Sequence, residues 1–100
     1  MIRGTTPTHI FNIPFDVAAI DELKITYVQW GNIVITRSKS DCTLEGTTIK
    51  TSFTQEETFK FSSDKPVEIQ VRILTVDGEA LASIIQKVDV GRCLDSEVLT

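Results

Sequence analysis

Few residues in this chain have the types and the spacing that catalysis requires. His9 is the sole histidine, and the common schemes of acid–base and nucleophilic catalysis would depend on it as the base. Cys42 and Cys93 have no candidate base beside them in the sequence. The chain contains no Gly-x-Ser-x-Gly elbow, Cys-x-x-Cys pair, phosphate-binding loop or His-x-x-x-His zinc spacing. We therefore predict that the protein is not an enzyme and has no catalytic or cofactor-binding residues.

Acidic and aromatic side chains give no better candidate for a bound ion or sugar. Asp16, Asp21 and Glu22 fall near one expected bend, and a second polar cluster falls at 55–57. Neither has the alternating oxygen ligands and glycine turn of a calcium loop, so we interpret both as caps or solvated surface and predict no metal site. Trp30 lies beside an expected turn, but one aromatic residue makes no sugar-binding platform.

The overall composition argues against several classes of partner. The net charge over 100 residues is -4, whereas nucleic-acid affinity is built from arrays of Lys and Arg. No apolar run approaches the ~18 residues of a membrane-spanning helix, and residues 1–11 lack the apolar stretch of a signal peptide. We expect a protein that is made in the cytoplasm without a signal peptide and binds neither nucleic acid nor membrane. Its cysteines are then expected to be free thiols rather than a disulfide.

The clearest structural signal is a β-hairpin over residues 67–90. Apolar residues at the odd positions from 67 to 73 alternate with polar residues, which is typical of a half-buried strand. Asp77-Gly78 fits a two-residue type I′ turn. That turn predicts a core face with the pairs Val76–Glu79, Ile73–Ala82, Val71–Ile84 and Val67–Val88, and an outer face with the pairs Leu74–Leu81, Arg72–Ser83, Gln70–Ile85 and Glu68–Lys87.

Three apolar residues are left over on the outer face of this hairpin: Leu74, Leu81 and Ile85. Three explanations stay open, namely cover by the C-terminal tail or a loop, contact with a subunit or partner, and an incorrect register. The second follows from the tendency of exposed apolar patches to mark interaction sites. The predicted interaction surface consists of these three residues, Trp30, and the apolar residues of the tail, which are Leu94, Val98 and Leu99.

Two more turns are expected in the first half of the chain. In the hairpin over 23–38, a two-residue turn at Gly31-Asn32 and a three-residue loop at 30–32 are both possible. We favour the longer loop because it sets Tyr27 opposite Ile35 and keeps one face apolar, with Leu23, Ile25, Tyr27, Ile33 and Ile35. Glu45-Gly46 predicts the next turn, which places Asp41 opposite Lys50 and Cys42 opposite Ile49, so that Cys42 is a small buried hydrophobe.

Residues 9–15 predict the first strand, and Pro14 marks it as an edge strand. His9 is expected to be partly buried and hydrogen-bonded on the side of the strand that also carries Phe11, Ile13 and Phe15. Two short helical turns are also expected. One follows Asp16 as N-cap, and the other follows Thr54, which stands at capping-box spacing from Glu57.

These elements predict an all-β fold, specifically an immunoglobulin-like β-sandwich of about seven short antiparallel strands. A chain of this length has room for one domain, which would span 1–100. Its ends, 1–8 and 91–100, lack a clear period and could project as arms. Frayed termini are the ordinary interpretation, and arms that dock on neighbouring copies are the functional alternative.

A likeness to a known group is carried by five stretches in order: RGTTPTHIFNIPFD, DCTLEG, TQEETFKF, VEIQVRILT and ALAS...VGRCLDSEVL. Together they cover most of the chain and resemble small β-domain proteins encoded by bacteriophages and prophages of gut Firmicutes. The resemblance implies a non-enzymatic virion structural or accessory protein of the capsid or tail. Its expected partners are other virion proteins or copies of itself, in a homo-oligomer within an assembly.

Two rival functions stay open. A small acidic phage protein can be a counter-defence factor that binds a host immune protein, although a net charge of -4 hardly imitates a phosphate backbone. A carbohydrate-binding adhesion module would use an exposed Trp30. Neighbouring genes separate the three functions, because capsid and tail genes, unrelated small early genes and a tail-fibre locus would each favour a different one.

Overall fold

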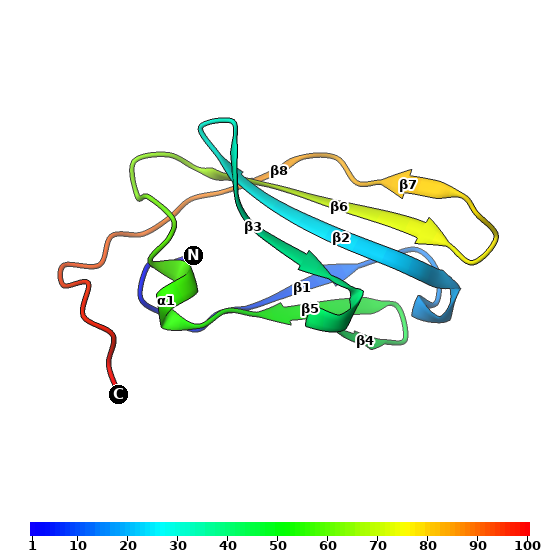
Figure 1. Cartoon of the computed structure of the whole chain (residues 1–100), viewed down its shortest axis with the longest axis horizontal. Coiled ribbons are helices and arrows are strands. Elements are labelled where there is room, and N and C mark those ends of the chain that lie inside the picture. The colour runs from blue at the N-terminus through cyan, green and yellow to red at the C-terminus, as the bar shows by residue number, and fades with distance from the viewer.

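Short alternating stretches of the chain form eight strands in a computed structural model that describes residues 1–100 (Figure 1). The strands are β1 (Thr8–Asn12), β2 (Ile20–Gln29), β3 (Asn32–Ser38), β4 (Thr43–Glu45), β5 (Thr48–Ser52), β6 (Val67–Thr75), β7 (Ala80–Ala82) and β8 (Gln86–Val88). Three helical segments interrupt them, namely the 3₁₀ turns η1 (Val17–Ala19) and η2 (Lys39–Asp41) and the α-helix α1 (Gln55–Thr58). The predicted all-β class is confirmed.

The strands form two sheets that lie as layers in Figure 1. One sheet has the order β1-β5-β4, and the other has the order β3-β2-β6, with β7 and β8 both paired to the free side of β6. All of these pairings are antiparallel. The chain crosses between the sheets after β1, after β3 and after β5. Each hairpin therefore stays within one sheet.

A single cluster of 13 buried apolar side chains fills the space between the layers. Ile25 and Tyr27 of β2, Ile49 of β5 and Val67 of β6 have no exposed surface. The remaining odd residues of β6 up to Ile73 are also buried, so the predicted core face of this strand is confirmed. Burial of large apolar side chains like these, at about 1.5–3 kcal/mol each, is the main force that holds the layers together.

The predicted register of the last hairpin is confirmed far from the turn and is wrong near the turn. Val67 pairs with Val88 and Glu68 with Lys87, as predicted. Near the turn the observed pairs are Arg72–Ala82, Ile73–Leu81 and Leu74–Ala80, one residue away from the prediction. The cause is a three-residue loop at 76–78, in which the Thr75 N–H donates to the Glu79 carbonyl and Gly78 has a φ of +85°.

The pairings of β7 and β8 with β6 differ in register by one residue, and one extra residue in the segment 83–85 accounts for the difference. The Ser83 N–H donates to the Val71 carbonyl at 2.8 Å, and the Ser83 hydroxyl accepts from the Val71 N–H at 3.0 Å. A side-chain oxygen thus replaces the backbone carbonyl that a regular strand would supply. The segment behaves as a β-bulge, which separates β7 from β8.

The first hairpin reaches the predicted pairing by a different turn. Tyr27 lies opposite Ile35 as expected, but Gln29 pairs with Asn32 and Val28 with Ile33. The turn is therefore the two-residue pair 30–31, and the predicted three-residue loop is wrong. A bulge between Tyr27 and Val28 in the pairing restores the register and leaves Ile33 on the outer face, 61% exposed, rather than in the core.

The turn between β4 and β5 lies one residue after its predicted position, which shifts the strand pairing by two residues. Thr43 pairs with Lys50, Leu44 with Ile49 and Glu45 with Thr48. The turn residues are therefore 46 and 47, with Gly46 at a φ of +56° in the first position, where a type II′ turn has glycine. The predicted pairs Asp41–Lys50 and Cys42–Ile49 are wrong, because Asp41 belongs to η2 instead of a strand.

Most of the remaining local predictions are confirmed, although the first strand ends at Asn12 instead of residue 15. β1 pairs only with β5 and is an edge strand. Phe11 of β1 packs against the core, as do Ile13 and Phe15 just after the strand. The Asp16 carboxylate accepts from the Ala18 N–H and caps η1. Thr54 and Glu57 form the capping box of α1.

The two ends of the chain lie at the same end of the molecule (Figure 1). Ile2 forms a parallel bridge with Gly91, and the Gly4 N–H donates to the Thr58 hydroxyl of α1 at 3.0 Å. Residues 1–5 are therefore held against the body instead of projecting as an arm. The tail from 92 onward has no regular secondary structure, and its docking on neighbouring copies stays a prediction.

Candidate functional site

The predicted apolar patch on the last hairpin is not continuous. Leu81 pairs with Ile73 and packs against the core, so its placement on the outer face is wrong. Leu74 is half-buried beside Ala80, while Ile85 is 55% exposed within the bulge. The three-residue loop at 76–78 shifted β7 by one residue, and a shift of one residue turns every side chain to the opposite face.

Trp30 lies at the tip of the hairpin formed by β2 and β3 and is 54% exposed. It does not fold onto the edge of the sandwich. Its φ of 49° is the only positive value at a residue other than glycine, and this left-handed conformation costs a bulky side chain roughly 1–2 kcal/mol. A strained aromatic residue that remains exposed is a candidate contact residue.

The apolar residues of the C-terminal tail have different environments. Leu94 and Leu99 are 93% and 75% exposed, whereas Val98 is partly buried. The side-chain amide of Gln55 in α1 donates to the Leu99 carbonyl at 2.8 Å and accepts from its N–H at 2.9 Å. Gln55 thus holds the tail by the pair of hydrogen bonds that a neighbouring strand would supply. Most of the apolar surface of the tail remains uncovered.

A groove of about 570 Å³, which the sequence analysis did not predict, opens where β1 faces β7. Its walls include Phe11 and Phe15 on one side and Leu81 on the other, with Val71 and Ile73 of β6 also in the lining. No residue of β5 takes part, and none of the lining residues carries a charge. The groove therefore lies beside the unpaired edge of β1 and offers a purely uncharged surface.

Two exposed isoleucines belong to this region and were missed from the sequence. Ile10 of β1 lines the groove and is 56% exposed. Ile84 follows Ser83, a further lining residue, and is 81% exposed. The alternation of β1 places Ile10 on the solvent side, which is the signal that could have identified it. Ile84 was not predicted to be exposed, because its predicted pairing with Val71 placed it in the core.

A second hollow, of about 1300 Å³, differs from the groove in its charge. Its lining includes Lys24, Arg37, Lys39 and Arg72 together with two acidic residues. Lys24 and Arg72 lie directly opposite each other on β2 and β6, and like charges in this position repel. This face is cationic on a protein whose net charge is -4.

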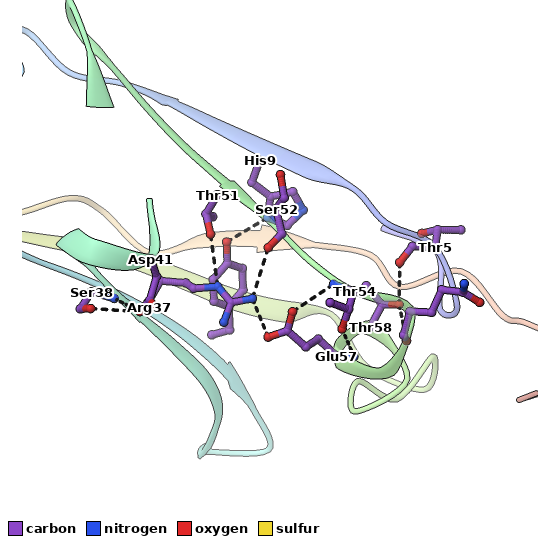
Figure 2. A network of polar contacts seen from close by, with 12 residues as sticks. Thr5, His9, Arg37, Ser38, Asp41, Thr51, Ser52, Thr54, Glu57 and Thr58 are labelled. Carbon is purple, nitrogen blue, oxygen red and sulfur yellow. Dashed lines mark hydrogen bonds and ion pairs between the residues drawn. The ribbon is translucent and has the colours of Figure 1, made fainter. Parts of the chain in front are cut away.

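Arg37 forms the centre of a polar network that connects β3, β5 and α1 (Figure 2). Its guanidinium contacts a Glu57 carboxylate oxygen at 2.7 Å and donates to the Thr51 hydroxyl at 3.2 Å. It also lies over the Phe53 ring, 4.6 Å from the centroid. Although burial alone would raise the pKa of Glu57, hydrogen bonds from the Thr54 N–H and Arg37 together with the Arg37 charge lower it. The network joins the two sheets, because β3 and β5 belong to different sheets.

His9 is partly buried and hydrogen-bonded, as predicted. Its Nδ1 lies 2.9 Å from the Tyr27 hydroxyl (Figure 2), and burial lowers the pKa of the imidazole, with a smaller contribution from the positively charged N-terminus. Burial also raises the pKa of Tyr27. The pair therefore consists of two neutral groups inside the aromatic cluster of Phe53 and Phe61.

The cysteine thiols and the side chains that could bind a metal ion do not gather at one place. Both cysteines are free, and burial raises the pKa of the Cys42 thiol, which makes it a poorer nucleophile. No three His, Cys, Asp or Glu side chains gather in a group that could hold a metal ion. None of the helices has the length and hydrophobicity needed to cross a membrane.

Comparison with known proteins gave no significant match to a family model, a curated protein or a solved structure.

Proposed function

We propose that this chain is a non-enzymatic structural or accessory protein of a phage virion, a capsid decoration or tail component that acts by self-association or by docking on a larger assembly. The observation that carries the proposal is the distribution of exposed apolar residues. Nine large apolar side chains are exposed, and several lie on strand edges and the tail instead of one polar-rimmed pocket. Small contacts of this kind become effective in an assembly with many copies.

We infer further that the sandwich is immunoglobulin-like. Three strands in the order β1-β5-β4 correspond to B, E and D of an immunoglobulin domain, and β3-β2-β6-β7 correspond to C′, C, F and G. The crossings between sheets after β1, β3 and β5 agree with this assignment. No strand occupies the place of strand A beside β1, and this is the position of the uncharged groove.

The proposal is tested by quantitative mass spectrometry of purified particles produced by the phage or induced prophage that encodes the chain. We expect many copies per particle, in a fixed ratio to the major capsid or tail protein. The chain should be depleted from particles only by treatments that dissociate them. Absence of the protein from washed particles, together with a strictly monomeric mass by light scattering at high concentration, would contradict the proposal.

A further inference from the structure

We propose that the open edge of β1 and the groove beside it accept an extended strand, residues 94–98, from the tail of a second copy of this chain. The inference rests on the proposed assembly function and names the surface and the segment that would join the copies. Binding of this kind adds a strand to a sheet, with backbone hydrogen bonds for affinity and alternate side chains in the groove for specificity.

Backbone geometry identifies which groups of β1 are free to pair. The Phe53 N–H donates to the Pro7 carbonyl, and the Ile13 N–H donates to the Thr47 carbonyl. Because residues of an antiparallel ladder bond to a given neighbour alternately, Pro7, His9, Phe11 and Ile13 face β5. The backbone groups of the residues between them, Thr8, Ile10 and Asn12, point to the open edge, where no strand is paired.

The groove defines the side chains that the incoming strand must carry. Its lining includes Phe11, Phe15 and Leu81 and contains no charged residue. Side chains that enter it must be apolar or small, because an unpaired charge placed there would lose its hydration. The opposite face of the same strand would remain in water and can carry charges.

The C-terminal tail meets this requirement. In an extended conformation, Leu94, Ser96 and Val98 lie on one side, and Asp95 and Glu97 lie on the other. The five residues 94–98 match the five residues of β1. Leu94 is 93% exposed on its own chain, so this segment has apolar surface that gains from burial.

The tail of the same molecule does not occupy the groove. Gln55 anchors Leu99 beside α1, and Figure 1 places α1 and the tail at one end of the molecule and β7 toward the other. The strand must therefore come from a neighbour. Because the accepting edge and the donated tail are different surfaces, association is head-to-tail and builds open chains or closed rings.

The test compares two variants with two matched controls. Ile10→Lys places a charge at the open edge, as natural edge strands do to prevent pairing, and Leu94→Lys places one on the inward side of the tail. The controls are Ile33→Lys, at an exposed isoleucine on β3, an edge strand of the other sheet, and Leu99→Lys, on the outward side of the tail. All four variants make the same change of charge.

Sedimentation velocity of the full chain, from micromolar to millimolar concentration, gives the readout. We expect wild type to exceed the dimer mass with increasing concentration, and both control variants to follow it. Ile10→Lys and Leu94→Lys alone should associate at least about tenfold more weakly, a loss of about 1.4 kcal/mol or more. An equimolar mixture of these two variants should recover a dimer, because one still donates a tail and the other still accepts it.

Several outcomes would overturn the inference. These are a monomeric wild type at millimolar concentration, equal weakening by Ile33→Lys and Ile10→Lys, normal association of Leu94→Lys, and no dimer in the mixture. Folding of each variant is checked by amide chemical-shift dispersion. If Ile10→Lys does not fold, Ile10→Pro replaces it, since proline is tolerated on edge strands and removes the outward N–H. A monomeric wild type also bears on the proposed function, but the presence of the protein in particles is measured independently, so failure of the inference and failure of the proposed function are distinguishable.

Discussion

At the scale of single residues, Arg37 is the side chain with the most diverse contacts between the sheets. Replacement by methionine retains much of its packing but removes the ion pair with Glu57 and the hydrogen bond to Thr51. We expect Arg37→Met to lower the free energy of unfolding by roughly 1.5–3 kcal/mol, because hydrogen bonds to charged groups have this magnitude and Glu57 loses its partner. Urea denaturation measures the change.

Arg72 supplies the matched control for this substitution. It is exposed and faces Lys24 on the neighbouring strand, so Arg72→Met should change the free energy of unfolding by no more than about 0.5 kcal/mol. A double-mutant cycle with Glu57→Gln then isolates the coupling between Arg37 and Glu57. A coupling near zero would show that Arg37 acts through packing on Phe53 instead of through the ion pair.

His9 makes stability depend on pH. Its pKa is lower in the folded protein than in the unfolded chain, so the unfolded chain binds more protons at a pH between the two values. The free energy of unfolding should therefore be unaffected by His9 above about pH 6.5, the ordinary value for histidine, and should fall as the pH decreases below it. Thermal unfolding scans in steps of pH measure this dependence.

The variant His9→Gln separates this effect from that of the carboxylates. Glutamine can still bond to the Tyr27 hydroxyl but does not titrate, so the decline that begins near pH 6.5 should disappear. The pKa of Glu57 is lowered on folding, so the stability due to Glu57 is lost only as the pH falls below about 4.3, its unfolded range. An unchanged profile in His9→Gln between pH 5 and 7 would contradict the role of His9.

At the scale of secondary-structure elements, the bulge at 83–85 allows β7 and β8 to pair with the same strand in two registers. The Ser83 hydroxyl satisfies the N–H of Val71, a residue that is only 7% exposed. Ser83→Ala should therefore cost roughly 1–3 kcal/mol, which is the cost of leaving a buried donor unpaired. Amide hydrogen exchange at Val71 should increase in parallel.

Ser40→Ala is a suitable control for Ser83→Ala, because its hydroxyl contacts only the exposed Ser38 hydroxyl. Faster exchange in Ser40→Ala to the same extent would show a general loss of stability. A Val71 amide that stays protected in Ser83→Ala would mean that the segment re-forms regular pairing with the other register.

The predictions from sequence succeeded and failed at this scale for identifiable reasons. Alternation identified the inward residues of β6, because burial of one face imposes a period of two. Side-chain caps at Asp16 and Thr54 were also predictable, since they depend on neighbours within three residues. The turns were not, because two-residue and three-residue loops share the same glycine signals and differ only in the pairing that follows.

At the scale of the whole molecule, the two ends of the chain close one end of the sandwich through Thr58. Its hydroxyl accepts from the Gly4 N–H and donates to the Thr5 or Gln55 carbonyl, and the residue is fully buried. Thr58→Val keeps the shape and removes these bonds. We expect a loss of roughly 1–3 kcal/mol and faster exchange of the Gly4 amide.

Thr48→Val serves as the comparison, because the Thr48 hydroxyl makes one local bond to the Glu45 carbonyl far from the termini in sequence. This variant should leave the Gly4 amide as protected as in wild type. Unchanged protection of Gly4 in Thr58→Val would mean that the bridge between Ile2 and Gly91 alone holds the N-terminal segment.

The sequence by itself determined the all-β class, the core face of β6, the edge position of β1 and the caps of its short helices, because these depend on alternation and on contacts a few residues apart. Only the tertiary structure decided which apolar residues remain exposed and where the groove lies. Those properties depend on register and on which strands meet across the sandwich. A one-residue loop difference turned Leu81 inward, and the uncharged groove is formed by segments about 70 residues apart in the chain, at Ile10 and Leu81.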